Sequence, residues 1–426
     1  MTQWSKQQEH AMHIVGRWMR NPSGPQVMYL AGFAGTGKTT LAKHLVGGTG
    51  RRWLFAAFTG KAAHVMRMKG CSGACTIHSM IYRPNGESKA SEIRILESKL
   101  FNIQRQVDEA PAAEPGCASY KDDLLQQVFK IKKQLERLHD EREPMFALWA
   151  NSPLADMDVD GVVIDECSMV DDFLGQDLES FGKKILVLGD PAQLPPVGAG
   201  GRYTKREPDV MLTDVHRQAK QSGILELATL VRERGIVNAH EYGDDCKVLQ
   251  TSWVDRDLLA GMVLVADQVL VGRNRTRKNF NARHRELLGR TSATPQPGDK
   301  LVCLRNDRAM GIYNGSQWRV ETACSDIGSK TCDLELQCED DSSRIRLGAW
   351  LHHMIGAEQE LTSMGWDRRD LAEFDYSYAL TTHKAQGSQW PHVLVFDESS
   401  AFGSDVGRRW LYTAITRAAK KLTVLI

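Results

Sequence analysis

The sequence predicts an α/β protein of several domains that is built around a parallel sheet. Three observations lead to this prediction. An apolar run enters a glycine-rich loop and then a helix at residues 27–44, and buried-strand patterns alternate with helical patterns up to about residue 190. Residues 297–374 then shift to short β-like runs. A chain of 426 residues is too long for one core, so we expect about two to four domains.

The nucleotide-binding loop is the clearest local signal. Residues 27–40 read VMYLAGFAGTGKTT, which fits the P-loop pattern with a strand before it and a helix after it. Glycines lack the β-carbon that would keep backbone N–H groups away from phosphate oxygens, and the helix N-terminus adds positive charge. We expect Lys38 to reach the β and γ phosphates and the Thr39 hydroxyl to hold Mg²⁺. The predicted ATP-binding residues of the loop are Gly32, Gly35, Thr36, Gly37, Lys38, Thr39 and Thr40.

The N-terminal segment and the second strand supply further candidates. Ser5 is a plausible N-cap of an amphipathic helix that carries Gln8. The Gln8 amide could read the edge of an adenine, because it donates and accepts at once, or Gln8 could be an ordinary exposed residue. Residues 54–58 form a buried-strand pattern, and the turn at residues 59–63 follows it. Loops at the carboxyl ends of parallel strands bind ligands in α/β sheets.

An acidic pair ends a third strand pattern at residues 162–164. Asp165 would hold Mg²⁺ through water, and Glu166 would orient or deprotonate the attacking water. The alternative is a purely structural pair, which is less attractive downstream of a P-loop. A further strand, residues 185–188, leads into a loop with three prolines where Gln193 could sense a γ-phosphate.

Composition gives few constraints on partners. Lys and Arg total 54 against 53 Asp and Glu, so any nucleic-acid surface must come from local clustering. Such a cluster lies at residues 272–290, which contain seven Lys or Arg residues and one acidic residue, Glu286. The cluster could bind nucleic acid, or it could be the solvated face of a helix, which explains it equally well. The nine cysteines form no CxxC pair, no apolar run approaches the ~20 residues of a membrane span, and no signal-peptide core is present. We therefore expect a cytoplasmic protein with no membrane contact.

Residues 91–139 are predicted to form an antiparallel helical hairpin. Apolar residues recur there with alternating spacings of three and four on two otherwise charged segments, which is a heptad seam, and a segment with two prolines and a glycine separates them. The charged flanks could contact DNA or a partner, or the hairpin could be an inert insertion.

The order of eight short motifs resembles one helicase family. The motifs GFAGTGKTT, FTGKAA, TIHSMIY, DECSM, LGDPAQLPPVG, VHRQ, TTHKAQGSQW and YTAITRA resemble those of superfamily 1 DNA helicases of the RecD/Dda-like group, superfamily 1B. The resemblance spans residues 5–426. It implies two RecA-like P-loop NTPase domains with ATP between them, single-stranded DNA across both, and 5′ to 3′ translocation.

The resemblance also implies a domain arrangement. The expected parts are a first RecA-like domain at residues 1–82 and 150–205, the inserted helical hairpin at 83–149, a second RecA-like domain at 206–297 and 375–426, and a small SH3-like β-barrel insertion at 298–374. The barrel would hold DNA on the second domain, and Asn314-Gly315 is a strong turn signal within it. The helical seam is longer than the short β-hairpin wedge of Dda-like helicases, so the element that splits the duplex stays open. We expect no extra module after Ile426.

Site residues follow from matching the motifs. Arg217 and Arg417 occupy the positions of the family's arginine fingers, which would complete the ATP site from the second domain. The expected catalytic residues are Lys38, Asp165, Glu166, Gln193, Arg217 and Arg417, and Gln8, Arg217 and Arg417 are also expected to bind ATP. The expected DNA-binding residues are Phe58, Thr59, Lys61, His78, Thr381, Thr382, Lys384 and Trp390. Trp390 could stack on a base or pack in the core.

The function that follows is an ATP-dependent DNA helicase with Mg²⁺ as cofactor. It would act 5′ to 3′ on single-stranded DNA and duplex junctions as a monomer, in replication, repair or recombination, with proteins of those processes as partners. Three alternatives are considered. The first is an RNA or RNA–DNA helicase of the same superfamily, and the second is a non-unwinding P-loop ATPase switch that acts on protein. A DNA-binding module with a vestigial ATP site is a third, which the intact Lys38, Asp165, Glu166 and Arg417 argue against.

Overall fold

The computed structural model divides into two compact units, which are residues Met1–Ile77 with Met157–Ile426, and residues His78–Asp156. The structure describes residues 4–84, 146–149, 152–195, 201–214, 222–292, 294–307, 312–324, 329–363 and 371–426, with positions 100, 103, 124, 126–128, 130–133 and 310. The first unit contains two sheets, whose strands are parallel except for one edge strand, and a closed barrel. We call the part around the first sheet the first lobe (residues 4–77 and 157–214) and the part around the second sheet the second lobe (222–297 and 377–426). The barrel comprises residues 300–376.

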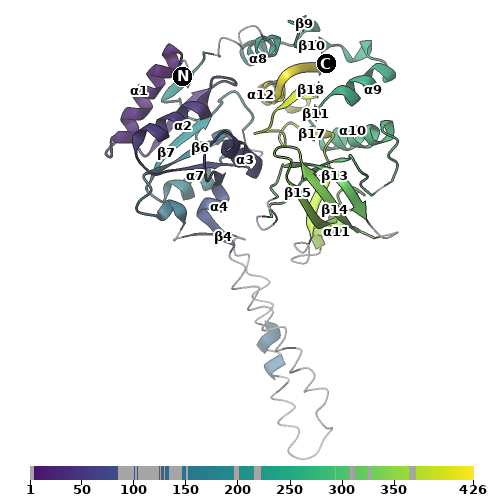
Figure 1. Ribbon diagram of the computed structural model, residues 1–426, viewed down its shortest axis with the longest axis horizontal. Coiled ribbons are helices and arrows are strands. Elements are labelled where there is room, and N and C mark those ends of the chain that lie inside the picture. The colour runs from purple at the N-terminus through teal and green to yellow at the C-terminus, as the bar shows by residue number, and fades with distance from the viewer. Residues whose placement is uncertain are drawn as a thin grey trace, which may run out of the picture. The chain divides into compact units, whose positions relative to one another are not determined.

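The first lobe is a six-stranded parallel sheet flanked by helices (Figure 1). Its strand order is β3-β2-β6-β7-β1-β8, and every neighbouring pair is parallel. The strands are β1 Val27–Gly32, β2 Trp53–Ala57, β3 Cys75–Thr76, β6 Gly161–Asp165, β7 Lys184–Gly189 and β8 Val210–Leu212. The helices are α1 Lys6–Arg20, α2 Lys38–Thr49, α3 Gly60–Met68 and α7 Asp172–Glu179. This confirms the parallel sheet expected around the P-loop.

Strand β8 corrects one expected boundary. The second domain was expected to begin at residue 206, but Leu30, Ala31 and Gly32 of β1 pair with Val210, Met211 and Leu212 of β8. Val210 and Leu212 are buried against the core of the first lobe, at 7% and 1% exposure. The chain therefore completes the first sheet before it crosses to the second lobe, because β1 has an open edge that β8 covers.

The second lobe is another six-stranded sheet, ordered β17-β11-β18-β19-β10-β9. All neighbouring strands are parallel except β9 and β10, which are antiparallel, with β9 at the edge. The strands are β9 His240–Tyr242, β10 Cys246–Leu249, β11 Gln268–Val271, β17 Ala379–Thr381, β18 Trp390–Phe396 and β19 Ala418–Leu425, and the helices are α8 Gly223–Arg234, α9 Arg256–Val265, α10 Asn274–Leu287 and α12 Ser404–Ile415. Trp410 of α12 is fully buried on this sheet and anchors the helix there.

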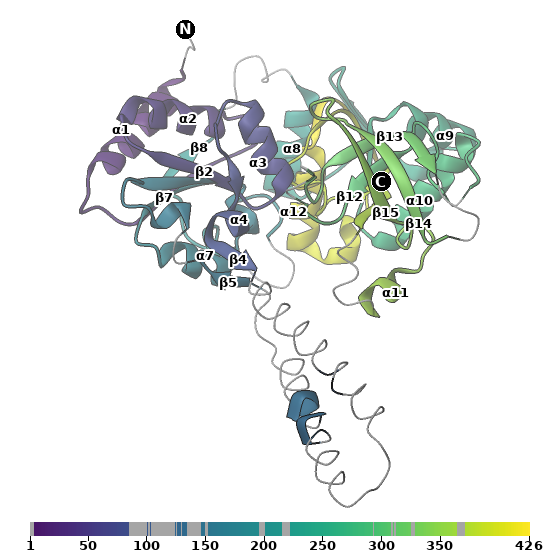
Figure 2. The ribbon, with the colours of Figure 1, turned by 60° about the horizontal axis from the view of Figure 1, so that its bottom comes forward.

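The barrel interrupts the second lobe between β11 and β17 in the chain, and Figure 2 shows its strands grouped together in green. Its five strands form a closed barrel: β12 Lys300–Cys303, β13 Gln317–Cys324, β14 Thr331–Cys338, β15 Arg344–Trp350 and β16 Ala372–Tyr376. The short helix α11 Glu358–Ser363 lies between β15 and β16 in the chain. Trp318 and Phe374 fill its core at 2% and 0% exposure. The Asn314-Gly315 turn forms as expected, with Gly315 at φ +87°, where a side chain would be strained.

The basic segment 272–290 mainly anchors the barrel. Arg277 of α10 lies 2.6 Å from Asp375 of β16, and both side chains are buried. Arg285 and Arg290 both pair with the fully buried Asp299, at 3.3 and 2.9 Å. Lys278 pairs with Glu358. Since these four basic side chains pair with carboxylates of the barrel or with Asp299, directly before its first strand, neither an open nucleic-acid surface nor a solvated helix face describes the cluster as a whole.

The second unit is described over a small part of its length. The structure gives α4 Ile77–Ile81 at its start and a two-stranded antiparallel sheet of β4 Tyr82–Pro84 and β5 Phe146–Leu148. The helical hairpin expected at residues 91–139 lies almost entirely outside the described residues. Among the residues that are described, no helix combines the length and the apolar character that a bilayer crossing requires.

Candidate active site

The P-loop has the geometry that its sequence predicts. Gly35 and Gly37 adopt φ +79° and +80°, and Gly37 caps the N-terminus of α2 in this left-handed conformation. A β-carbon on Gly32 would lie 2.6 Å from Thr36 Oγ1. Thr36 is fully buried and its hydroxyl donates to Phe33 O, so this threonine shapes the loop from within.

The candidate Mg²⁺ ligands lie together. Thr39 Oγ1, on the first turn of α2, donates to Asp165 Oδ2, at the end of β6, at 2.7 Å. Lys38 Nζ folds over the same loop and donates to Gly32 O and Phe33 O at 2.7 and 3.1 Å. A hydroxyl and a carboxylate fit Mg²⁺, which prefers oxygen ligands and takes the rest from water and phosphates.

Glu166 occupies a strained position directly after Asp165. Its φ of +54° is rare for a residue with a side chain, and such strain is concentrated at functional sites. Burial raises the pKa of the Glu166 carboxyl; the Arg417 guanidinium opposes this shift and Asp165 adds to it. A carboxylate with a raised pKa is a better proton acceptor near neutral pH than an ordinary glutamate.

Residues from both lobes converge on Glu166. Arg417, from the end of α12, is 4% exposed and donates to Thr413 O and Ser388 O within the second lobe. With its amide nitrogen towards Glu166, Gln193 donates to Glu166 Oε2 at 3.3 Å and accepts from Arg417 Nη2 at 3.2 Å. Gln193 of the first lobe thus bridges the carboxylate and the arginine of the second lobe. Arg217 lies outside the described residues.

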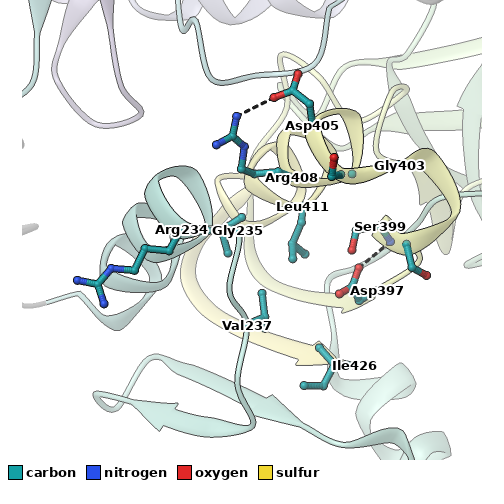
Figure 3. Close-up of a pocket in the computed structure, with 14 residues that line it drawn as sticks. Arg234, Gly235, Val237, Asp397, Ser399, Gly403, Asp405, Arg408, Leu411 and Ile426 are labelled. Carbon is teal, nitrogen blue, oxygen red and sulfur yellow. Dashed lines mark hydrogen bonds and ion pairs between the residues drawn. The ribbon is translucent and has the colours of Figure 1, made fainter.

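These residues line a cavity of about 470 Å³. Its walls include Lys38, Thr39, Thr40, Asp165, Glu166 and Gln193 from the first lobe and Gly387, Ser388, Gln389 and Arg417 from the second. A larger cavity of about 770 Å³ lies in the second lobe between the end of α8 and the start of α12, where Asp405 pairs with Arg408 (Figure 3). It contains no P-loop residue and no acidic pair, so the smaller cavity is the candidate nucleotide site.

One of the two roles expected for Gln8, that of an exposed surface residue, is wrong. It is 3% exposed, so it is not a surface residue. Its amide oxygen accepts from Ser5 N in a capping box, and its amide nitrogen donates to Thr36 O at 3.0 Å. These contacts brace the P-loop, and since an amide carries two N–H groups and two oxygen lone pairs, the reading of an adenine edge by Gln8 stays a prediction.

Some of the expected DNA-binding residues of the two lobes lie close together. Thr59 caps α3, and Gly387 of the 381–389 loop lies close to it. Lys61 is 6% exposed, lies 3.5 Å from Asp340 of the barrel, and sits over the ring of Trp390. Phe58 is half-buried, Thr381 and Thr382 are buried, and Lys384 is exposed. His78 is exposed and belongs to the second unit.

Trp390 is a core residue in this structure. It is 7% exposed, and its indole N–H donates to Gln317 Oε1 at 2.8 Å. The Gln317 amide in turn donates to Gln268 Oε1, and Gln268 Nε2 donates to Ser377 O, directly after the last strand of the barrel. The structure therefore gives Trp390 the second of its two expected roles, packing in the core, and a contact with DNA stays a prediction.

The sequence does not predict the hydrogen bonds between α12 and the first lobe. Tyr412 Oη donates to Asp190 Oδ2 at 2.7 Å, Arg409 Nη1 donates to Pro191 O at 2.7 Å, and Thr413 Oγ1 accepts from Leu194 N at 3.0 Å. Tyr412 and Thr413 lie three and four residues after Arg409, so the three side chains share one face of the helix. The motif YTAITRA was visible, but nothing local in it shows that its tyrosine reaches a residue 222 positions away.

The sequence was compared with protein-family models and with known proteins. A family model described as an AAA domain matches residues 4–251, more than half of the chain, and a UvrD-like helicase C-terminal domain model matches residues 376–425. The ATP-dependent RecD2 DNA helicase of Deinococcus radiodurans is 29% identical over 287 residues, which are 61% of this chain and 35% of that protein. The chain thus spans about a third of the length of this curated relative.

Solved Pif1 structures share the fold. Bacteroides Pif1 bound to ssDNA aligns with a TM-score of 0.52 at 16% identity, covering 100% of this chain and 92% of that one. The Pif1 helicase from Candida albicans aligns with a TM-score of 0.51 at 15% identity, covering 100% and 94%. At these identities the likeness shows the fold alone. The AAA-domain model matches residues 4–251, more than half of the chain, so the chain belongs to that family, and its residues 376–425 match the UvrD-like helicase C-terminal domain.

Proposed function

We propose that this chain is an ATP hydrolase that moves 5′ to 3′ along single-stranded DNA and separates duplex DNA. The observation that carries the proposal is the cavity in which Lys38 and Glu166 of one lobe face Arg417 of the other. A site completed from two lobes can couple hydrolysis to lobe movement, because the charge on the phosphates changes the attraction between the lobes.

The hydrolysis step uses residues whose positions are described. Lys38 would leave the P-loop carbonyls for the β and γ phosphates, while Thr39 and Asp165 would hold Mg²⁺. Mg²⁺, when bound, supplies charge neutralisation for the phosphates. Glu166 would take the proton of the attacking water, Gln193 would hold that carboxylate against Arg417, and Arg417 would stabilise the negative charge that develops on the phosphate.

The DNA step is supported by the family and by chemistry. Thr59 and Lys61 on the first lobe and Thr381, Thr382 and Lys384 on the second would hold the backbone phosphates, because hydroxyls and amines contact phosphate without reading sequence. Bacteroides Pif1 is solved bound to ssDNA, and the Deinococcus relative is named a DNA helicase. One melted base-pair step costs ~1.4 kcal/mol on average, which hydrolysis of one ATP can supply.

The test is an unwinding assay on four substrates, namely DNA and RNA duplexes with a 5′ or a 3′ single-stranded tail. We expect opening of the 5′-tailed DNA only. Lys38→Ala should abolish both ATP hydrolysis and unwinding. Lys43→Ala is a matched control, because Lys43 lies on the same helix but its amine bonds Lys69 O at the surface.

The outcomes separate the proposal from its alternatives. Preferential opening of 3′-tailed DNA would refute the polarity, and preferential opening of RNA would refute the substrate. ATP hydrolysis that is unaffected by added single-stranded DNA, with no unwinding of any substrate, would instead indicate a switch that acts on protein.

A further inference from the structure

The hydroxyl of Tyr412 is the one polar atom of its side chain, and it crosses from the second lobe to the first. Tyr412 is 2% exposed, and its Oη donates to Asp190 Oδ2 at 2.7 Å. The same oxygen accepts from the backbone N–H of Ala34, in the P-loop, at 3.4 Å. One atom therefore connects α12, the P-loop and the end of β7.

Asp190 depends on this contact. Its carboxylate is 2% exposed, with Oδ1 accepting from Ala192 N at 3.0 Å and Oδ2 accepting from Tyr412. Burial, followed by the charge of Asp190, raises the pKa of Tyr412 well above its usual value, so the phenol stays protonated and remains a donor. A buried carboxylate that loses such a donor keeps an unsatisfied charge, which is costly enough to make it move.

The loop that begins at Asp190 carries Gln193. Besides Tyr412, the second lobe holds this 190–194 loop through Arg409, which donates to Pro191 O, and Gln386, which donates to Leu194 O. Gln193 lies between these attachments, with its amide between Glu166 and Arg417. The position of Gln193 therefore depends on where α12 holds the loop relative to the P-loop.

We propose that Tyr412 is a positioning residue for ATP hydrolysis. Its hydroxyl fixes Asp190 against the P-loop backbone, and this keeps Gln193 between the general base and the arginine. Tyr412 touches neither phosphate nor water in this role and acts through the loop. The inference rests on the proposed ATP hydrolysis and adds to it a residue that ties lobe closure to the placement of the catalytic amide.

The test is Tyr412→Phe, which keeps the buried ring and removes the hydroxyl. We expect kcat for ATP hydrolysis, measured with single-stranded DNA, to fall by about tenfold to a hundredfold, since a hydrogen bond to a charged group is lost from the reacting arrangement. The KM for ATP should change by less than about threefold, because Lys38 and Thr39 still hold the phosphates. Tm should match that of the control below.

Two further variants make the test specific. Tyr242→Phe is the control: Tyr242 is also a buried tyrosine of the second lobe, but its hydroxyl makes only a 3.4 Å contact with Asn238 O inside that lobe. Asp190→Asn, alone and combined with Tyr412→Phe, tests the route. If Tyr412 acts through Asp190, the double variant should be no slower than the slower single variant.

Each result decides the matter. A kcat within twofold of the parent for Tyr412→Phe would overturn the proposal, and so would losses that simply multiply in the double variant. A lowered Tm, with kcat reduced only in proportion to unfolded protein, would assign Tyr412 to stability and also overturn it. In all three cases Lys38→Ala would still abolish hydrolysis, whereas survival of activity in Lys38→Ala would instead defeat the proposed function.

Discussion

Replacing Arg277 with methionine is expected to loosen the barrel, because the change leaves the Asp375 carboxylate buried without its ionic partner. Arg277 lies on α10 in a segment that sequence alone could assign to nucleic acid. In the structure its Nη1 lies 2.6 Å from Asp375 Oδ2, and the two side chains are 5% and 8% exposed. Asp375 lies on β16, the strand that closes the barrel against β12 and β15.

The expected size of the effect follows from this burial. Removing one partner of a buried ion pair costs ~3–5 kcal/mol, because the remaining charge is uncompensated. Lys384 interacts electrostatically with both members of the pair and offsets part of the loss. We therefore expect about 3 kcal/mol, which corresponds to roughly a hundredfold increase in the opening equilibrium of the barrel.

Hydrogen exchange of the β16 amides measures this opening directly. Arg277→Met should lower their protection by that factor, and adding Asp375→Asn should restore most of it. Arg283→Met is the control, since its exposed pair with Glu286 contributes about 0.3–0.5 kcal/mol. Unchanged protection together with weaker binding of single-stranded DNA would refute the reasoning and return Arg277 to the nucleic-acid surface.

Two other predictions concern DNA affinity and pH. Asp340→Asn should tighten binding of single-stranded DNA by about threefold at low salt, because it frees the amine of Lys61; Asp333→Asn, an equal charge change at an exposed barrel position, should not. An equal effect of both variants would show a net-charge effect instead. His284 stacks on Tyr378, and burial lowers its pKa from 6.5 to about 4. Between these values the unfolded chain binds more protons, so stability should be complete above about pH 6.5 and fall by roughly 3 kcal/mol as the pH drops to about 4. Unfolding free energies of His284→Phe should lack this slope; identical slopes in both proteins would contradict the assignment.

Much of the candidate nucleotide site could be predicted from the sequence because its determinants are local. The left-handed glycines at 35 and 37, the threonine after the lysine and the acidic pair after a buried strand are each fixed by a few neighbouring residues. The signal for buried strands such as β1 and β11 is also local, since a short apolar run between turn residues is typical of a buried strand. The barrel strands and their Asn314-Gly315 turn follow from the same kind of pattern.

Other assignments depended on residues far away in the chain. Nothing near Gln8 shows that its amide bonds Thr36, and nothing near Trp390 shows that Gln317 satisfies its indole. The basic run at residues 272–290 has the same composition whether its arginines meet phosphates or buried carboxylates. Composition gives the charge of a side chain, and only the neighbours decide whether that charge is free.

By itself the sequence determined the P-loop, the acidic pair and the alternation of strands and helices, since these are set by spacing within a few residues. Only the tertiary structure decided which atoms of the two lobes meet. The Tyr412 hydroxyl reaches Asp190 across 222 positions, and β8 joins the first sheet rather than the second. Such contacts arise when two sheets and a helix pack around one cavity, and the free energy of that packing is a property of the whole arrangement, which no short segment contains.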